Sequence, residues 1–310
     1  MSMALTHLLP ARARPNLTVR ADSLVDRVEL TGMRAHGVRL ADGSVLEAGR
    51  VVLAAGAYAS PAILMRSGVG PQASLDSVGV TTRVELNGVG NNLSDHPLVA
   101  VDLPTAPTTG MARLPLTLTA RTSRCDPSEP PDLHVFPAGP FEAESAPSGG
   151  VIGIVTGLLA PKARGWVRLR SSEPSQPPMI RTPLLDHDDD LARMVEATVL
   201  ARTLSRTAPL ADFVSGPELA PGPDIADDDV EGLAESIRAR VAPYHHPVGT
   251  CAMGPDPDRG AVVDAHGAVH GVRGLWVADA SIMPTIPSAG TNLSTVLVAT
   301  KIGEYLARSL

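Results

Sequence analysis

Two short stretches in the last third of the chain carry most of its information. Tyr-His-His-Pro-Val-Gly-Thr-Cys-Ala-Met-Gly occupies residues 244–254, and Asp-Ala-Ser-Ile-Met-Pro at 279–284 leads into Pro-Ser-Ala-Gly-Thr-Asn at 287–292. The first stretch holds imidazoles in a turn rich in proline and glycine. The second follows a short apolar strand with an acid, and then carries an amide, Asn292, where a helix is expected to begin. We therefore expect both stretches to lie at one active site.

The composition is that of a globular protein with an aliphatic core. The chain has 310 residues, of which 44% are hydrophobic and 19% charged, and this length predicts about two domains. Aromatic residues make up only 3%, which leaves few platforms for stacking nucleic-acid bases. The net charge of -7 also disfavours polyanions. We therefore expect no nucleic-acid partner.

The cysteines and the apolar runs give an expectation for the cellular compartment. Cys125 and Cys251 are too few for a disulfide framework and lack the paired spacing of a zinc site. No apolar run reaches the roughly 18 residues of a membrane span, and no basic region followed by a long apolar stretch opens the chain. The sequence therefore predicts a cytoplasmic protein without a membrane span.

The acidic run at 186–190 resembles a metal-binding cluster in its composition. A helical pattern begins directly after it, and acidic residues complement the N-terminus of a helix. No ligand pattern continues downstream. We interpret the run as a capped and solvated first turn, and expect no metal site.

Short strands dominate the N-terminal side of the chain, with Asp42-Gly43 as a hairpin signal between two of them. The last of these strands runs into Ala54-Ala55-Gly56. Ser60-Pro61 is then expected to open a helix with proline in its first turn. The predicted strands are 17–19, 23–30, 36–40, 45–47 and 50–53.

The composition changes after His96-Pro97, where prolines spaced by threonines and small residues run from 104 to 131. We interpret this run as irregular edge structure. Beyond it, apolar alternation predicts an antiparallel sheet and then helices. The predicted strands are 132–136, 151–159 and 166–170; the predicted helices are 188–204 and 227–240; a strand at 274–279 and a helix at 292–306 follow.

These stretches, taken with three further motifs, resemble the glucose-methanol-choline (GMC) family of flavin-dependent alcohol oxidoreductases. The first motif is Gly-Ala-Tyr-Ala-Ser-Pro at 56–61, continued by Ser-Gly-Val-Gly-Pro at 67–71. The others are Val-Gly-Asn-Asn-Leu-Ser-Asp-His-Pro at 89–97 and Ala-Arg-Gly at 163–165. The resemblance spans nearly the whole chain and implies FAD as the cofactor.

The resemblance implies an α/β (α+β) fold in three parts. Residues 1–97 would form an incomplete FAD-binding domain, 98–240 a substrate-binding domain built on an antiparallel sheet, and 241–310 a return to the FAD-binding domain. No G-x-G-x-x-G occurs near the start, although this motif brings a helix N-terminus to the dinucleotide pyrophosphate. We therefore interpret the chain as a C-terminal portion of such a protein. The alternative is a non-catalytic fragment, or a dependent subunit that needs a separate polypeptide carrying the glycine motif.

The resemblance also implies roles for individual residues. His246 would remove the hydroxyl proton of an alcohol while a hydride passes to flavin N5, and Asn292 would stabilise the alkoxide. Histidine suits this task because its reference pKa lies near neutrality. His245 would point to the opposite face of an extended segment. The positions implied to contact FAD are Val25, Ala55, Gly56, Asp279, Ala280, Thr291, Asn292 and Leu293.

Other histidines receive plainer interpretations. His96 is expected to be a turn residue packed near the flavin domain. His266 and His270 have a spacing found in some metal sites, but Gly267 interrupts any helix there, so a surface hairpin is predicted. The expected substrate is a fairly apolar primary alcohol, and the residues do not distinguish an oxidase from a dehydrogenase.

Overall fold

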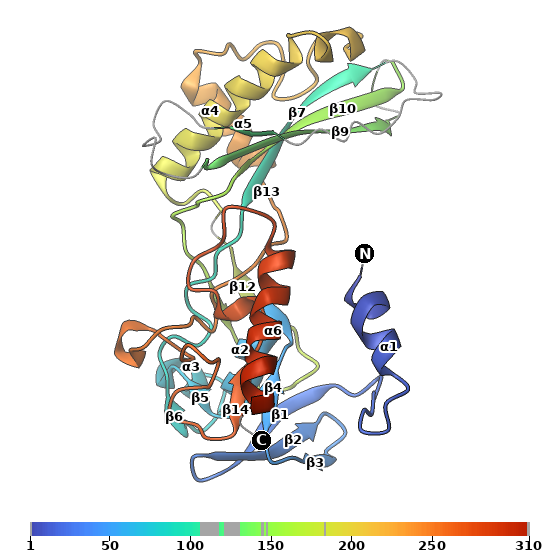
Figure 1. Cartoon of the computed structure of the whole chain (residues 1–310). Coiled ribbons are helices and arrows are strands. Elements are labelled where there is room, and N and C mark those ends of the chain that lie inside the picture. The colour runs from blue at the N-terminus through green and yellow to red at the C-terminus, as the bar shows by residue number, and fades with distance from the viewer. Residues whose placement is uncertain are drawn as a thin grey trace.

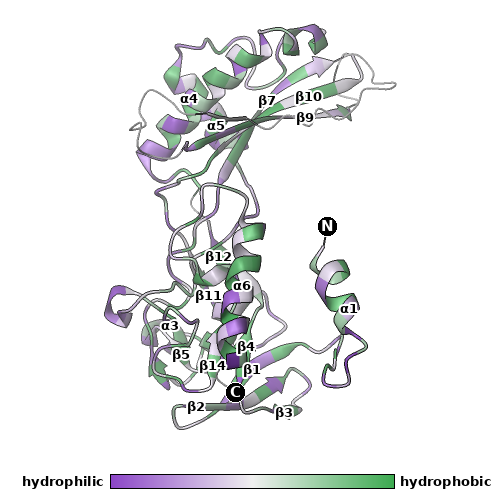
Figure 2. Cartoon of the chain, viewed as in Figure 1, coloured by the Kyte–Doolittle hydropathy of each residue, from purple (hydrophilic) through white to green (hydrophobic). Residues whose placement is uncertain are grey.

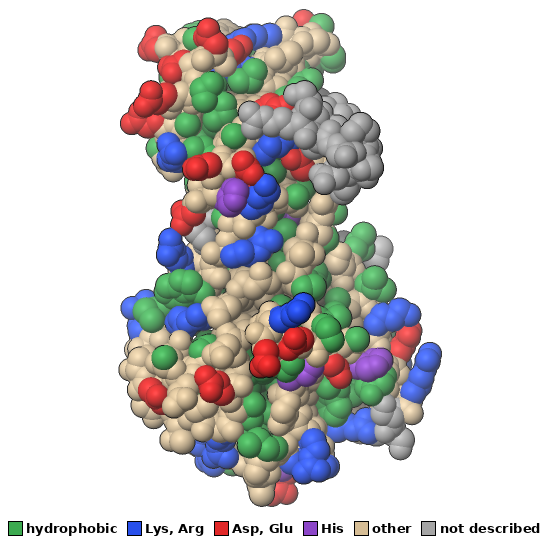
Figure 3. Space-filling view, turned by 90° about the vertical axis from the view of Figure 1, so that its left-hand side faces the viewer, with side chains coloured by type: hydrophobic (Ala, Val, Ile, Leu, Met, Phe, Trp, Pro, Cys, Tyr) green, Lys and Arg blue, Asp and Glu red, His purple; other side chains and the backbone are tan. Residues whose placement is uncertain are grey.

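The protein, described here from a computed structural model, has two lobes (Figure 1). The structure describes residues 2–105, 118–120, 131–143, 146, 148–182 and 184–308. The first lobe contains most of the chain before Pro97 and the segments after Pro243; the second contains a large sheet with two long helices. Figure 3 shows a narrower waist between the lobes, with acidic and basic side chains interspersed over the displayed face.

The first lobe begins with short helices and an antiparallel sheet. The turns η1 (Ala4–Leu8) and α1 (Leu9–Ala11) precede the sheet of β1 (Val25–Thr31), β2 (Arg34–Leu40) and β3 (Val45–Glu47). These strands confirm those predicted between residues 23 and 47, with small shifts at their ends. The strand predicted at 17–19 is wrong: these residues are exposed and have no regular secondary structure.

A parallel pair of strands joins two distant parts of the sequence. β4 (Val51–Leu53) pairs with β14 (Leu275–Val277), with Leu53 opposite Val277. Since the strands are parallel, their carboxyl ends meet at one edge. The residues that follow each strand, Ala54 to Gly56 and Ala278 to Ala280, are thereby brought together.

The helix α2 (Gly56–Arg66) begins earlier than predicted, and Pro61 lies in its interior rather than its first turn. A proline at this position cannot donate a hydrogen bond to the carbonyl four residues earlier. That carbonyl, on Ala57, instead accepts a 2.6 Å hydrogen bond from the buried Thr250 hydroxyl. A side chain from a distant loop thus replaces the helix hydrogen bond that Pro61 removes.

The remaining elements complete the first lobe around one aliphatic core. Val167 and Leu169 pack in this core, so the run predicted at 166–170 belongs here and not to the sheet of the second lobe. The His266–His270 segment forms the predicted turn, in which Val263 bridges Val269 in antiparallel fashion. The other elements are β5 (Val69–Gly70), α3 (Gln72–Asp76), β6 (Val84–Glu85), β11 (Trp166–Arg168), β12 (Met179–Arg181), η3 (Pro257–Arg259), η4 (Ala280–Ile282) and α6 (Thr291–Arg308).

The second lobe is a five-stranded antiparallel sheet covered on one face by helices (Figure 1). The predicted antiparallel sheet is therefore confirmed. Its order is β13 (Ala242–Pro243), β7 (Pro97–Thr105), β10 (Gly150–Leu158), β9 (Leu133–Glu142) and β8 (Leu118–Ala120). Most of the proline-rich run and Cys125 lie outside the described residues, while Pro104 lies within β7.

The covering helices are α4 (Asp188–Ser205) and α5 (Val230–Arg240), which pack their apolar residues against the sheet and against each other. The first turn of α4 differs from its prediction. The His187 ring accepts the cap hydrogen bond from Asp189 N–H. Asp190 is only 1% exposed and accepts backbone N–H groups of Lys162 and Ala163. This carboxylate is therefore a buried loop anchor and not a solvated group.

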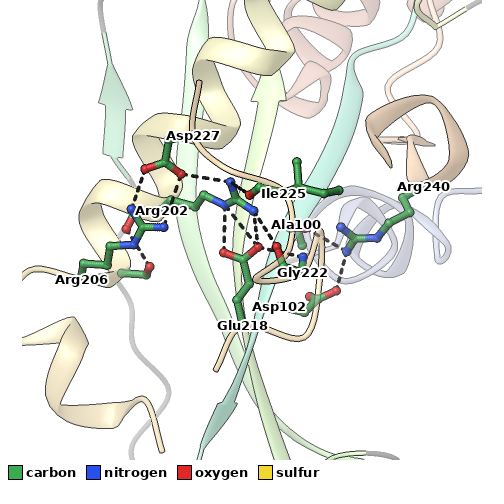
Figure 4. A network of polar contacts seen from close by, with 10 residues as sticks. Ala100, Asp102, Arg202, Arg206, Glu218, Gly222, Ile225, Asp227 and Arg240 are labelled. Carbon is green, nitrogen blue, oxygen red and sulfur yellow. Dashed lines mark hydrogen bonds and ion pairs between the residues drawn. The ribbon is translucent and has the colours of Figure 1, made fainter. Parts of the chain in front are cut away.

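A buried arginine ties the segment after α4, which includes η2 (Leu210–Phe213), to that helix (Figure 4). Arg202 is 1% exposed. Its guanidinium donates to Glu218, at 2.7 Å for the shortest contact, and to Asp227 at 3.0 Å. It also donates to the carbonyls of Gly222 and Ile225. The network fixes the loop between the two long helices.

Hydrophobic residues follow the strands of both lobes, while α6 carries hydrophobic and hydrophilic residues along its length (Figure 2). Among the described residues, no helix has both the length and the apolar composition needed to cross a membrane.

Candidate active site

His246 is held in a loop that pairs with a distant turn. Val248 and Ser94 exchange two backbone hydrogen bonds, and Tyr244 N–H donates to the His96 carbonyl at 2.9 Å. One carboxylate oxygen of Asp95 accepts the backbone N–H of His96 at 2.8 Å and that of His246 at 2.9 Å. Asp95 thus fixes both histidine backbones with one oxygen.

The neighbouring histidines of the loop differ in their surroundings. His245 has a φ of 61°, a left-handed conformation that few residues other than glycine adopt. Its side chain is exposed, whereas His246 is half-buried between Tyr244 and His96. His246 is therefore the ring that contacts other aromatic groups, and His245 is the exposed one.

His96 makes a contact that the sequence did not predict. Its Nδ1 lies 3.0 Å from Nδ1 of His246, and the two rings are nearly perpendicular, at 89°. His96 is fully buried. The only signal in the sequence is the Asp-His pair before Pro97, which places an acid beside an imidazole.

Burial sets the charge of these groups. Burial, together with the neighbouring His246, lowers the pKa of His96 to about 4. Burial also lowers the pKa of His246, although the negative charge of Asp95 opposes this effect. Both imidazoles are therefore neutral at pH 7. The pKa of Asp95 is raised by burial, and the two backbone hydrogen bonds partly offset this.

The loop before α6 brings the second predicted catalytic segment to His246. A Cβ placed on Gly290 would lie 3.8 Å from Cε1 and Nε2 of His246. Asn292 follows as the second residue of α6 and is exposed. The Nε2 edge of His246 thus faces the start of the helix that carries Asn292.

A second cluster forms where β4 and β14 end. Asp279 is 5% exposed, and one of its oxygens accepts Gly56 N–H at 2.9 Å and the Ser60 hydroxyl at 2.5 Å. Its other oxygen accepts Ser281 N–H at 2.8 Å. Ser60 also accepts Ala55 N–H at 3.0 Å. The structure therefore brings the predicted residues Ala55, Gly56, Asp279 and Ala280 together, and adds Ser60, which looked like a helix start in the sequence.

Comparison with known proteins identifies the family. Family models described as GMC oxidoreductase match residues 1–98 and 161–299. The chain belongs to the GMC oxidoreductases. The fold combines helices and strands in both lobes and has an antiparallel sheet in the second. It is the fold of this family of FAD-dependent enzymes.

Individual GMC relatives match almost the whole chain. It is 34% identical to 5-(hydroxymethyl)furfural oxidase of Methylovorus sp., over 95% of this chain and 58% of the relative. It is also 34% identical to oxygen-dependent choline dehydrogenase 1 of Chromohalobacter salexigens, over 98% and 59%. Pyridoxine 4-oxidase from Mesorbium loti superposes with a TM-score of 0.84 at 29% identity, over 96% and 60%. The chain thus spans about three fifths of the length of these relatives.

The residues at the β4 and β14 ends fit the family cofactor. Gly56 has a φ of 81°, and a Cβ placed on it would meet no atom within 4 Å, so the backbone is open to a ligand there. Ala54 and Ala55 are exposed and small. The ends of parallel strands and the starts of helices are where α/β folds bind dinucleotides. Thr291, at the start of α6, is buried, and Leu293, two residues later, is 81% exposed. Val25 is the first residue of β1 and packs against the first-lobe core.

Proposed function

We propose that this chain supplies the catalytic residues of an FAD-dependent oxidoreductase that oxidises an alcohol CH–OH group to a carbonyl. The observation that carries this proposal is the pair of Nδ1 atoms, 3.0 Å apart, on His96 and His246. Two neutral imidazoles can form this hydrogen bond only if one Nδ1 carries the proton and the other accepts it. The position of that proton decides which face of His246 is basic.

His246 serves as a base when its own Nδ1 carries the proton. It then donates to Nδ1 of His96, and the lone pair of His246 is on Nε2, the atom that faces Gly290 and the start of α6. Nε2 accepts the hydroxyl proton of the substrate. His96 is a positioning residue: its low pKa keeps the ring neutral, and in the tautomer with the proton on Nε2 its Nδ1 is the acceptor.

Asn292 completes the proposed chemistry. Its amide donates hydrogen bonds to the oxygen on which negative charge develops as His246 removes the proton. Bound FAD would supply the oxidant of the reaction, an acceptor for the hydride of the alcohol carbon. The residues proposed to hold it are Val25, Ala55, Gly56, Asp279, Ala280, Thr291, Asn292 and Leu293.

A second candidate is a dependent subunit that acts only with a polypeptide segment carrying a glycine-rich dinucleotide-binding unit. Among the described residues, β4 pairs only with β14, and Val52 is 43% exposed. The buried residues of α6 are Thr291 and Ile302 alone, while Leu297 is 58% exposed. An open strand edge beside an apolar helix face invites further pairing. Such a segment would cover both surfaces.

The visible absorption spectrum of the purified chain, with and without added FAD, tests the proposal. We expect a protein-bound flavin band that bleaches when an alcohol is added without oxygen. A bound flavin that no alcohol bleaches would contradict the proposed reaction. A folded chain that binds no flavin would favour the dependent subunit, and co-expression with a glycine-motif domain of a relative should then restore the band.

A further inference from the structure

The proposed reaction leaves a positive charge on His246. The proton leaves the hydroxyl oxygen of the substrate and binds Nε2, so the ring then carries an N–H at both nitrogens and becomes an imidazolium. Nδ1 of this ring lies 3.0 Å from Nδ1 of His96, which is itself neutral. A charge that is partly buried is costly unless an opposite charge lies near it. The contact with His96 orients the base but does not supply that charge.

Asp95 is the acid that contacts the loop of His246. The residue is 4% exposed, and its Oδ1 accepts the backbone N–H of His246 at 2.9 Å. The imidazole is joined to that nitrogen through Cα and Cβ, so the carboxylate lies close to the ring. Its negative charge raises the pKa of His246 against the effect of burial.

The carboxylate of Asp95 is not neutralised by another cation. None of the ion pairs formed by the described residues includes Asp95. Its Oδ2 is buried and has no hydrogen-bond partner in the described part of the chain. Both oxygens of the buried Asp279, by comparison, accept hydrogen bonds. The positive charges that act on Asp95 are those of protonated His246 and His245.

The contacts of Asp95 favour its charged form. Its Oδ1 accepts two backbone N–H groups, from His96 and His246, and hydrogen bonds to a carboxylate oppose its protonation. Burial acts in the opposite direction and raises the pKa of Asp95. A proton on Oδ2 would gain no hydrogen bond, because no acceptor among the described residues contacts that atom.

Other titratable side chains surround the pair, and burial keeps most of them uncharged at pH 7. It lowers the pKa of two imidazoles and raises the pKa of two phenols, and the charge of Asp95 raises one of the phenols further. The imidazoles are His96 and His134, and the phenols are Tyr58, beside Asp95, and Tyr244. His245 is exposed, and the segment 284–292 around Gly290 has no titratable side chain. These neighbours therefore add no second buried charge.

We propose that Asp95 is the countercharge of the His246 imidazolium during alcohol oxidation. The inference rests on the proposed function and deepens it by naming the group that stabilises the protonated base. In a Ser-His-Asp triad the acid contacts Nδ1 of the base. Here a neutral imidazole occupies that place, and the acid binds the backbone of the base instead. Asp95 acts through His246 and is therefore a positioning residue.

Asp95→Asn tests the inference, because the amide oxygen accepts the same backbone N–H groups without a charge. NMR titration of the full chain with isotope-labelled histidine measures the pKa of His246, and His246→Ala assigns its signals. We expect Asp95→Asn to lower this pKa by about 1, as for the loss of a neighbouring opposite charge. The matched control is Ser94→Ala in the same turn, since the Ser94 hydroxyl is buried and has no hydrogen-bond partner among the described residues. It should leave the pKa unchanged.

Kinetics of the FAD-loaded chain, with its completing segment if it needs one, separate the charge from a structural role. Without its countercharge His246 is a weaker base, so Asp95→Asn should lower kcat about three- to tenfold. The acid limb of kcat/KM should also move to lower pH, in step with the pKa of His246. A variant that only misplaces the loop would lower kcat and leave the limb where it is, which would overturn the inference.

The NMR titration needs no flavin and is therefore independent of the proposed reaction. Equal pKa values of His246 in the wild type and Asp95→Asn would overturn the inference. So would a carboxyl carbon signal of Asp95 that is protonated at pH 7 in the wild type, a measurement that stands even if Asp95→Asn does not fold. If no alcohol bleaches the flavin, the proposed function fails, whereas the titration still decides whether Asp95 is the charged partner of His246.

Discussion

Nδ1 of His96 and Nδ1 of His246 are 3.0 Å apart, so the two imidazoles share a single proton. The basicity of the half-buried His246 therefore depends on the buried His96 staying neutral. His96 is fully buried, and its pKa of about 4 prevents a second proton from entering the contact near neutral pH. A protonated His96 would place two donors face to face as long as His246 keeps its proton on Nδ1.

The first prediction concerns the proposed base. His246→Ala should slow flavin bleaching by alcohol roughly 10²- to 10⁴-fold, the usual contribution of a positioned general base. The measurement is stopped-flow absorbance without oxygen. His245→Asn is the matched control, because His245 is exposed and asparagine tolerates its left-handed backbone. A similar loss in both variants would show that the loop, and not the imidazole of His246, is responsible.

The second prediction concerns pH. Because burial lowers the pKa of His246 below its ordinary value of 6.5, the neutral, basic form persists at lower pH than in a free histidine. The kcat/KM for the alcohol should therefore be constant near pH 7 and fall with decreasing pH through an apparent pKa below 6.5. An acid limb centred above pH 7 would contradict this assignment of the base.

The sequence predicts the Asp279 cluster better than the histidine pair, and the reason is physical. The family resemblance implied Gly56 and Asp279 as contacts of one cofactor, and the parallel pairing of β4 with β14 brings the residues after both strands together. The contact of His96 with His246 depends on pairing between two irregular loops, and no periodicity encodes such pairing. Alternation likewise predicts a strand at 166–170 without indicating which sheet it joins.

The start of α2 was mispredicted for a related reason, and this gives the third prediction. Pro61 resembles a first-turn proline only because the donor that replaces its N–H, Thr250, lies in a distant loop. Thr250→Val removes that donor and leaves the Ala57 carbonyl without it, which should lower the free energy of unfolding by about 1–3 kcal/mol. Urea denaturation measures the change.

A double mutant tests the cause of that change. Pro61→Ala restores a backbone N–H that can donate to Ala57 within the helix. Adding it to Thr250→Val should recover much of the lost stability, with a coupling of about 1 kcal/mol or more between the sites. Strictly additive effects would mean that Thr250 stabilises the fold through packing alone.

The fourth prediction separates the buried and exposed arginines that share Asp227. Arg202 is 1% exposed and contacts Glu218, Asp227 and two carbonyls, whereas the side chain of Arg206 is 60% exposed. Arg202→Met should lower the free energy of unfolding by about 3–5 kcal/mol, because the Glu218 carboxylate is left largely buried without its partner. Arg206→Met should cost less than about 1 kcal/mol.

Replacing the acid as well tests the physical basis of that cost. Arg202→Met with Glu218→Gln removes the uncompensated charge, so the double variant should be more stable than Arg202→Met alone. If the double variant is instead less stable by the full cost of both changes, the network stabilises the loop through its individual hydrogen bonds rather than through charge balance. Thermal and urea unfolding of the wild type, Arg202→Met, Glu218→Gln and the double variant distinguish these outcomes.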